Sequence, residues 1–130
     1  DPDAFMNVLV NRTVKILEEE PVNVYVNPTF LPAQIAGDYD RLWTEERMQR
    51  VVKAAAARGI AIEINSRLRL PSLAFLRLAK RAGCKFTMGT NNTDRDIGKL
   101  DYSLEMIKEV GLGWKDFWVP TRRWTGKAKS

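Results

Sequence analysis

The chain has 130 residues, with no histidine and a single cysteine, Cys84. Histidine is the commonest general base and a frequent metal ligand, so its absence removes both roles. One cysteine cannot form an internal disulfide framework or a multi-cysteine zinc site. Because Cys84 begins an apolar run, we expect its thiol to be buried and unreactive.

The sequence also lacks any stretch long and apolar enough to span a bilayer, and it shows no signal peptide. We therefore predict no membrane partner. The chain begins with Asp1 and Pro2 and has no initiator methionine, from which we expect the natural N-terminus to lie upstream. The cellular compartment is then hardly constrained, and the cytoplasm is only a default.

Acidic residues are fewer than basic ones, 16 against 21, which gives a net charge of +5. Much of the excess lies near the C-terminus, where no acidic residue balances Arg122, Arg123, Lys127 and Lys129. We expect residues 121–130 to form a basic, flexible tail. The other basic residues are mixed with acids along helical faces, and no DNA- or RNA-binding motif is present. We therefore predict no nucleic-acid partner.

Hydrophobic residues make up 45% of the chain, enough for the core of a single domain. Short apolar runs rich in β-branched and aromatic residues predict strands over residues 22–26, 60–64 and 85–88. Apolar residues spaced by three and four predict helices over residues 4–20, 44–59, 71–82 and 101–110. This alternation predicts an α/β fold of parallel strands joined by right-handed helical crossovers.

Two further segments lack a clear period. Residues 28–41 contain prolines and a glycine, and we expect a loop that is either functional or loosely ordered. Residues 114–119 are predicted to form a short turn or an apolar strap that packs back onto the domain. The large aromatic residues are expected to be core or interface anchors; they are Trp43, Trp114, Phe117 and Trp118.

Asparagine follows each predicted strand. The loops that follow parallel strands gather at one edge of the sheet, where α/β proteins build their sites. We therefore expect one group of polar side chains to converge there: Asn27, Glu63, Asn65, Arg67, Thr90, Asn91, Asn92 and Asp94.

Glu63 is the unusual member of this group because it interrupts an apolar strand, where an unpaired charge is costly. It can serve as a general base or as a carboxylate that supports a neighbouring catalytic group. Alternatively it forms a structural pair with Arg67 or Arg47. The asparagines can hydrogen-bond a substrate, or they can satisfy loop backbone through Asx turns.

Arg67 and Arg69 precede the helix predicted over residues 71–82, and an arginine fork beside a helix N-terminus suits an anion. The alternative is that both are solvated surface side chains. In the following polar loop, Asp94 and Asp96 can bind a cation, or they pair locally with Arg95.

The three strand ends carry a resemblance. Residues 24–30 (Val-Tyr-Val-Asn-Pro-Thr-Phe), 62–65 (Ile-Glu-Ile-Asn) and 86–92 (Phe-Thr-Met-Gly-Thr-Asn-Asn) resemble the C-terminal half of the PHP (polymerase and histidinol phosphatase) domain. The likeness covers residues 22–119. The family comprises distorted (β/α)7 barrels, many of them metal-dependent phosphoesterases. It implies that the chain is the C-terminal portion of a partial (β/α) TIM-like barrel that hydrolyses phosphate esters.

The chain departs from the family where the family's chemistry lies. Asn27 and Pro28 stand where the family usually has His-Pro, and Asn91 and Thr93 stand at the positions of Asp and His metal ligands. The family's opening His-x-His would lie upstream. An Asn carbonyl can bind Mg²⁺ or Ca²⁺ but suits Zn²⁺ poorly. A divalent metal is thus implied by resemblance alone, with Asn27, Asn91 and Asp94 as the candidate ligands.

Our leading hypothesis is a PHP-like metal-dependent hydrolase, or its C-terminal fragment, inactive in isolation. Glu63 would be catalytic, and the substrate-binding group would be Asn27, Asn65, Arg67, Arg69, Thr90, Asn91 and Asn92. The alternative is a non-catalytic α/β module that binds a small polar, anionic or phosphorylated ligand, or a partner chain.

Assembly follows from the half-barrel hypothesis. Two sheet edges would be open, and an open edge invites another strand. We therefore expect either an upstream half of the barrel or a twofold dimer, formed through the strand edges or through residues 114–118.

Overall fold

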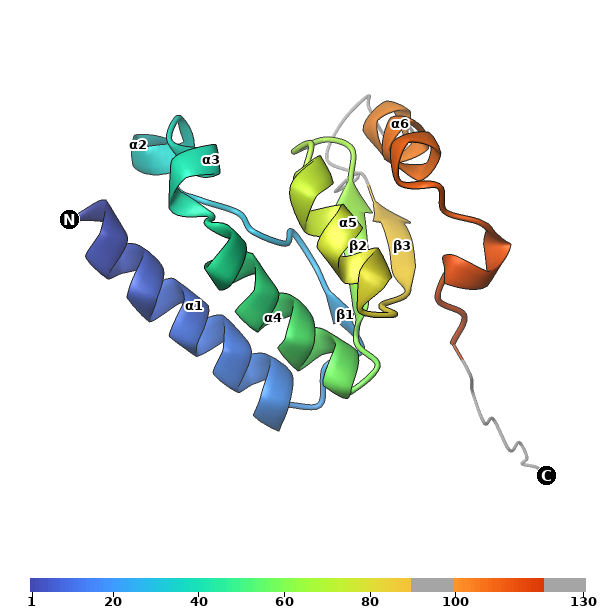
Figure 1. The fold of residues 1–130 in the computed structure, drawn as a ribbon, viewed down its shortest axis with the longest axis horizontal. Helices are drawn as coiled ribbons and strands as arrows, with labels where there is room; N and C mark the ends of the chain where they lie inside the picture. The colour runs from blue at the N-terminus through green and yellow to red at the C-terminus, as the bar shows by residue number, and fades with distance from the viewer. Residues whose placement is uncertain (90–99, 121–130) are drawn as a thin grey trace.

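The computed structural model describes residues 1–89 and 100–120 (Figure 1). Three parallel strands form an open sheet in the order β1-β2-β3, namely β1 (Val24–Tyr25), β2 (Ala61–Asn65) and β3 (Phe86–Gly89). The helices are α1 (Pro2–Glu19), α2 (Ala33–Ala36), α3 (Tyr39–Leu42), α4 (Glu45–Ala57), α5 (Leu73–Arg81) and α6 (Asp101–Val110), followed by a 3₁₀ turn at Trp114–Asp116. The predicted α/β alternation with parallel strands is confirmed.

The two faces of the sheet differ because successive residues of a strand point to opposite sides. Ile62, Ile64 and Phe86 share one face and are fully buried in a core formed with α4 and α5. We call this the helix-covered face. Glu63 lies beside Thr87 in the register and Asn65 beside Gly89, and these residues point to the other side, the opposite face.

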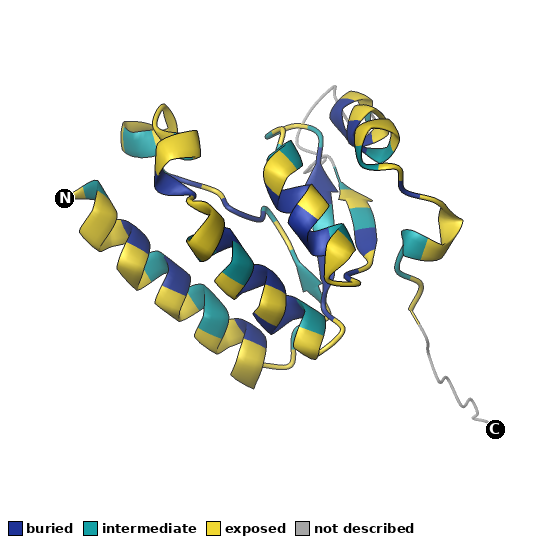
Figure 2. Ribbon diagram, in the orientation of Figure 1, coloured by how far each residue is buried: buried dark blue, intermediate teal, exposed yellow. Residues whose placement is uncertain are grey.

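The core lies between the strands and the helices. α4 packs against both α1 and α5, and α5 packs against α6. Figure 2 shows buried residues along the inner sides of these helices. Burying a Phe or Ile side chain contributes about 1.5–3 kcal/mol, so this layer supplies most of the favourable free energy of folding.

Local signals explain where α4 and α5 begin and where α6 ends. The hydroxyl of Thr44 accepts a hydrogen bond from the Arg47 N–H at 3.2 Å, as the predicted cap of α4 requires. Ser72 caps α5 in the same way through the Phe75 N–H, also at 3.2 Å. α6 ends at Gly111, whose φ of 79° is left-handed, so the predicted stop is confirmed.

The structure changes most predicted bounds by one or two residues, and three differences matter for the fold. α1 begins at Pro2, with Asp1 as its cap, because proline suits the first helical position. β1 covers two residues instead of the predicted five, since Asn27, with a φ of 46°, turns the chain away from the sheet. The segment predicted as a loop over residues 28–41 contains α2 and α3.

The outer edge of β3 is covered by the strap, which we define as residues 114–118. The Trp118 N–H donates to the Phe86 carbonyl at 2.9 Å, and Phe117 forms a bridge with Phe86. Trp114, however, is 82% exposed, so the expectation that it packs back was wrong. Within residues 1–89 and 100–120, no strand pairs with the free edge of β1.

Cys84 is buried between α5 and β3, as predicted. Burial raises the pKa of its thiol to about 11. In the part of the chain that the structure describes, no helix has the length and apolarity needed to cross a membrane.

Candidate functional site

The carboxylate of Glu63 is the centre of the candidate site, on the opposite face of β2. Its Oε1 accepts a hydrogen bond from the backbone N–H of Asn27 at 2.8 Å and one from Asn65 Nδ2 at 3.3 Å. The side chain is only partly buried. Two donors therefore fix one carboxylate oxygen at the end of the sheet where the strands finish.

Asn65 is fully buried, and its amide is bonded within the protein. Nδ2 also donates to Asn27 Oδ1 at 3.1 Å, and Oδ1 accepts from the Leu68 N–H at 2.8 Å. Its backbone exchanges two hydrogen bonds with Leu70, at 2.7 and 3.1 Å. These contacts favour the loop-building alternative for Asn65, while its predicted contact with a ligand stays a prediction.

Asn27 takes part through its backbone conformation. Its φ of 46° lies in the left-handed region, which asparagine tolerates better than most residues. This conformation accompanies the N–H contact to Glu63, and the Asn27 carbonyl accepts from Phe30 at 3.2 Å to close a turn. The convergence of Asn27, Glu63 and Asn65 at one edge of the sheet, expected from topology, is present.

Gly89 is the residue of this site that sequence analysis missed. A Cβ atom placed on it would lie 2.1 Å from Glu63 Oε2, far inside van der Waals contact. The glycine therefore leaves the space that the second carboxylate oxygen occupies. A glycine at a strand end, where another group approaches the backbone closely, is the signal that could have identified it.

A buried network supports the loop after Asn27. The Thr29 N–H donates to the Tyr25 hydroxyl at 3.0 Å, and Trp43 Nε1 donates to the Thr29 carbonyl, also at 3.0 Å. Thr29 has a left-handed φ of 65° and is almost fully buried. Burial raises the pKa of Tyr25 to about 12, so its hydroxyl stays protonated at physiological pH.

A pair of serines joins α6 to the end of β2. The Ser103 hydroxyl donates to the Ile64 carbonyl at 3.0 Å, and the Ser103 N–H donates to Ser66 Oγ, also at 3.0 Å. The two hydroxyl oxygens are 2.9 Å apart. This contact ties the loop after β2 to α6.

The predicted anion site at Arg67 and Arg69 stays a prediction. The Arg69 guanidinium lies 3.6 Å from Glu105 and 4.8 Å from the centre of the Tyr102 ring, both on α6. It lines a cleft of about 350 Å³ that also includes Asp40. Arg67 is exposed. The proposed pair of Glu63 with Arg47 is wrong, because Arg47 instead contacts Asp3 at 3.1 Å.

The remaining predicted site residues lie outside the described residues; they are Thr90, Asn91, Asn92 and Asp94. Across residues 1–89 and 100–120, no three His, Cys, Asp or Glu side chains gather into a possible metal site. The carboxylate of Glu63 is the anionic group that could bind a cation at this edge, and one of its oxygens already accepts two hydrogen bonds. Taken by themselves, these described side chains do not fit a divalent metal.

In comparisons with family models, curated proteins and solved structures, nothing matches this chain.

Proposed function

We propose that the chain is part of a PHP-like (β/α) barrel and that it binds a small polar ligand at the edge where Glu63 lies. The sequential order β1-β2-β3 supports this proposal. Right-handed crossovers between consecutive neighbouring strands place their helices on one face, as in a barrel wall. The opposite face would then line the barrel interior.

The observation that carries the proposal is the anchored carboxylate. Glu63 Oε1 is held by two donors, while Gly89 leaves room for Oε2. A carboxylate accepts hydrogen bonds and attracts positive charge. The part of the ligand that meets Glu63 is therefore a hydroxyl or an ammonium group. A phosphate on the same ligand would have to bind away from Glu63, nearer Arg67 and Arg69.

Hydrolysis of a phosphate ester is the second candidate function. The motifs at the three strand ends favour it, and Glu63 stands where a general base could act. Because the described residues do not fit a metal by themselves, we derive no metal-dependent step. We expect the chain alone to leave a phosphomonoester such as p-nitrophenyl phosphate unhydrolysed.

Binding is tested by NMR titration of the purified chain with ribose, ethanolamine and ribose 5-phosphate. We expect ribose or ethanolamine to shift the amide signals of Asn27 and Gly89. Glu63→Gln should lose these shifts, because the neutral amide turns an N–H donor toward the ligand. The control is Glu105→Gln, which removes an exposed carboxylate on α6 and should leave them unchanged.

Two results would count against the proposal. Equal shifts in wild type and Glu63→Gln would place the ligand elsewhere. Turnover of p-nitrophenyl phosphate by wild-type chain with Mn²⁺, abolished by a chelator, would instead favour the hydrolase.

A further inference from the structure

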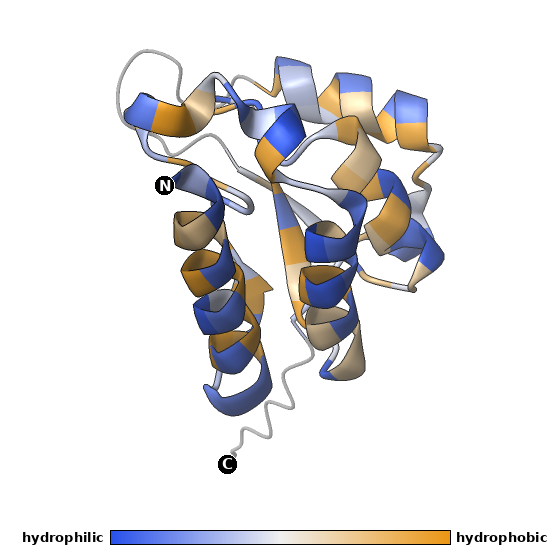
Figure 3. Cartoon of the chain, turned by 60° about the vertical axis from the view of Figure 1, so that its left-hand side comes forward, coloured by the Kyte–Doolittle hydropathy of each residue, from blue (hydrophilic) through white to orange (hydrophobic). Residues whose placement is uncertain are grey.

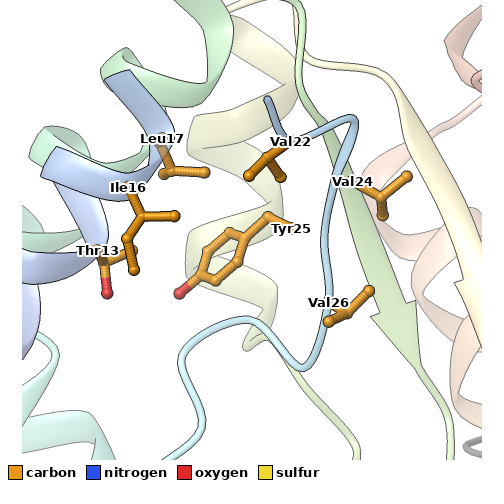
Figure 4. A pocket seen from close by; sticks show the side chains of 7 residues that line it. All are labelled: Thr13, Ile16, Leu17, Val22, Val24, Tyr25 and Val26. Atoms are coloured by element: carbon orange, nitrogen blue, oxygen red, sulfur yellow. The ribbon is translucent and has the colours of Figure 1, made fainter. Parts of the chain in front are cut away.

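An apolar groove of about 240 Å³ runs between α1 and the free edge of β1 (Figure 4). Figure 4 shows Ile16 on one side of it and Val26 on the other, with the Tyr25 ring between them. Ile16 is 49% exposed and Val26 is 58% exposed. Thr13 is the polar residue of a lining that otherwise consists of Ile16, Leu17, Val22, Val24, Tyr25 and Val26.

Among the residues that the structure describes, no strand pairs with the outer backbone groups of β1 beside this groove. The Asn23 carbonyl accepts from the Ala61 N–H at 2.9 Å, so residues 23 and 25 direct their backbone toward β2. Because these directions alternate along a strand, the N–H and carbonyl of Val24 point to the free edge. Such an edge can pair with another strand.

The two edges of the sheet are not equivalent. The strap covers the β3 edge and is held by Lys80, whose Nζ lies 3.1 Å from Asp116, and by Lys85, which donates to the Lys115 carbonyl at 2.8 Å. Pairing through the strap, which was one expectation for a dimer, would have to displace these contacts. The β1 edge needs no such displacement.

The charges on α1 are arranged in a way that suits a second copy. Arg12, Ile16 and Glu19 are spaced by four and three residues, so they lie along one side of α1, and Glu20 follows as its C-cap; all four are exposed. Glu20 extends the acidic end. Hydrophobic and hydrophilic residues alternate along α1 (Figure 3). A basic end and an acidic end flanking an apolar centre are complementary to the same surface turned by a twofold rotation.

We propose that a second copy of this chain occupies the groove, in a twofold dimer whose axis passes near Ile16. The β1 edges lie antiparallel, and Arg12 of each copy faces Glu19 and Glu20 of the other. Ile16 and Val26 of both copies form the apolar centre. Because the strap covers the other edge, addition stops at two chains. This inference does not depend on the proposed ligand, and it is the alternative to pairing with an upstream half of the barrel, which would occupy the same β1 edge.

Sedimentation equilibrium at micromolar concentration tests the dimer, with a charge exchange as the decisive variant. Arg12→Glu should weaken association roughly tenfold, because two symmetric pairs become repulsive. Glu19→Arg with Glu20→Arg should weaken it similarly, and all three substitutions together should restore it. Lys53→Glu, on an exposed part of α4, is the control and should change nothing. Val26→Asp should abolish the dimer.

Circular dichroism of each variant verifies that it is folded. A wild-type monomer at all concentrations that permit measurement would overturn the proposal. So would a dimer that tolerates both Arg12→Glu and Val26→Asp, because another face would then form the contact.

Discussion

The two faces of β2 have opposite chemistry although they alternate along one strand. Ile62 and Ile64 on the helix-covered face are fully buried and apolar. Glu63 and Asn65 on the opposite face are polar, and both take part in the hydrogen-bond network at the strand end. One face therefore stabilises the fold, while the other holds a charged group in position. A step of one residue separates the two roles, so substitutions on this strand can test them independently.

The largest expected effect is on the helix-covered face. Ile64→Ala should lower the free energy of unfolding by about 2–5 kcal/mol, because it leaves a cavity in the core under the helices. Urea denaturation monitored by circular dichroism measures the change. Glu63→Gln is the matched substitution one residue away, and we expect it to cost less than about 1.5 kcal/mol. If the two substitutions lowered the free energy of unfolding equally, the opposite face would contribute as much to stability as the helix-covered face.

An intermediate effect is expected at Gly89. Gly89→Ala should cost about 1–3 kcal/mol, since the new methyl group would collide with Glu63 Oε2. Urea denaturation again gives the value. Gly37→Ala is the control, because a Cβ atom there meets nothing within 4 Å.

A double-mutant cycle sharpens the Gly89 result. Adding Glu63→Ala removes the colliding carboxylate, so the loss from Gly89→Ala should shrink in that background. An unchanged loss would show that backbone conformation at residue 89, and not the carboxylate, requires glycine.

The smallest effect concerns the strap along the outer edge of β3, which borders both faces of the sheet. A hydrogen bond from the Gly113 N–H and then the Lys80 ammonium group hold the pKa of Asp116 below its ordinary value of 3.8. The ionised carboxylate therefore contributes stability above pH 3.8, and this contribution is lost as pH falls through the lower pKa of the folded state. As the pH falls below 3.8, hydrogen exchange of the Trp118 amide should become faster relative to its intrinsic rate, because the strap is held less firmly. Asp116→Asn should remove that pH dependence.

Elements defined by nearby residues were predictable from sequence. Thr44 at the start of α4 and Gly111 at the end of α6 act within one helical turn, so the pattern of residues predicts them. α2 and α3 have four residues each, too few to show a period. They lie between Thr29 and Trp43, which are joined by a hydrogen bond that no local pattern reveals.

The candidate site also has a part that the sequence predicts and a part that it does not. The meeting of Asn27, Glu63 and Asn65 follows from the alternation of parallel strands and helices. The role of Gly89 depends on the register of β2 against β3, which pairs residues 24 positions apart at Asn65 and Gly89. Whether an anion binds near Arg67 stays a prediction, as does the involvement of the loop after Gly89.

The burial of Cys84 gives the chain a practical property. A thiol with a pKa of about 11, enclosed by the core, has almost no thiolate at neutral pH to react with maleimides or iodoacetamide. A single cysteine introduced on the surface, for example Lys53→Cys, would then be labelled selectively without removing the native thiol. Fluorescent or spin probes could in this way be attached at one chosen surface position while the core keeps its native thiol.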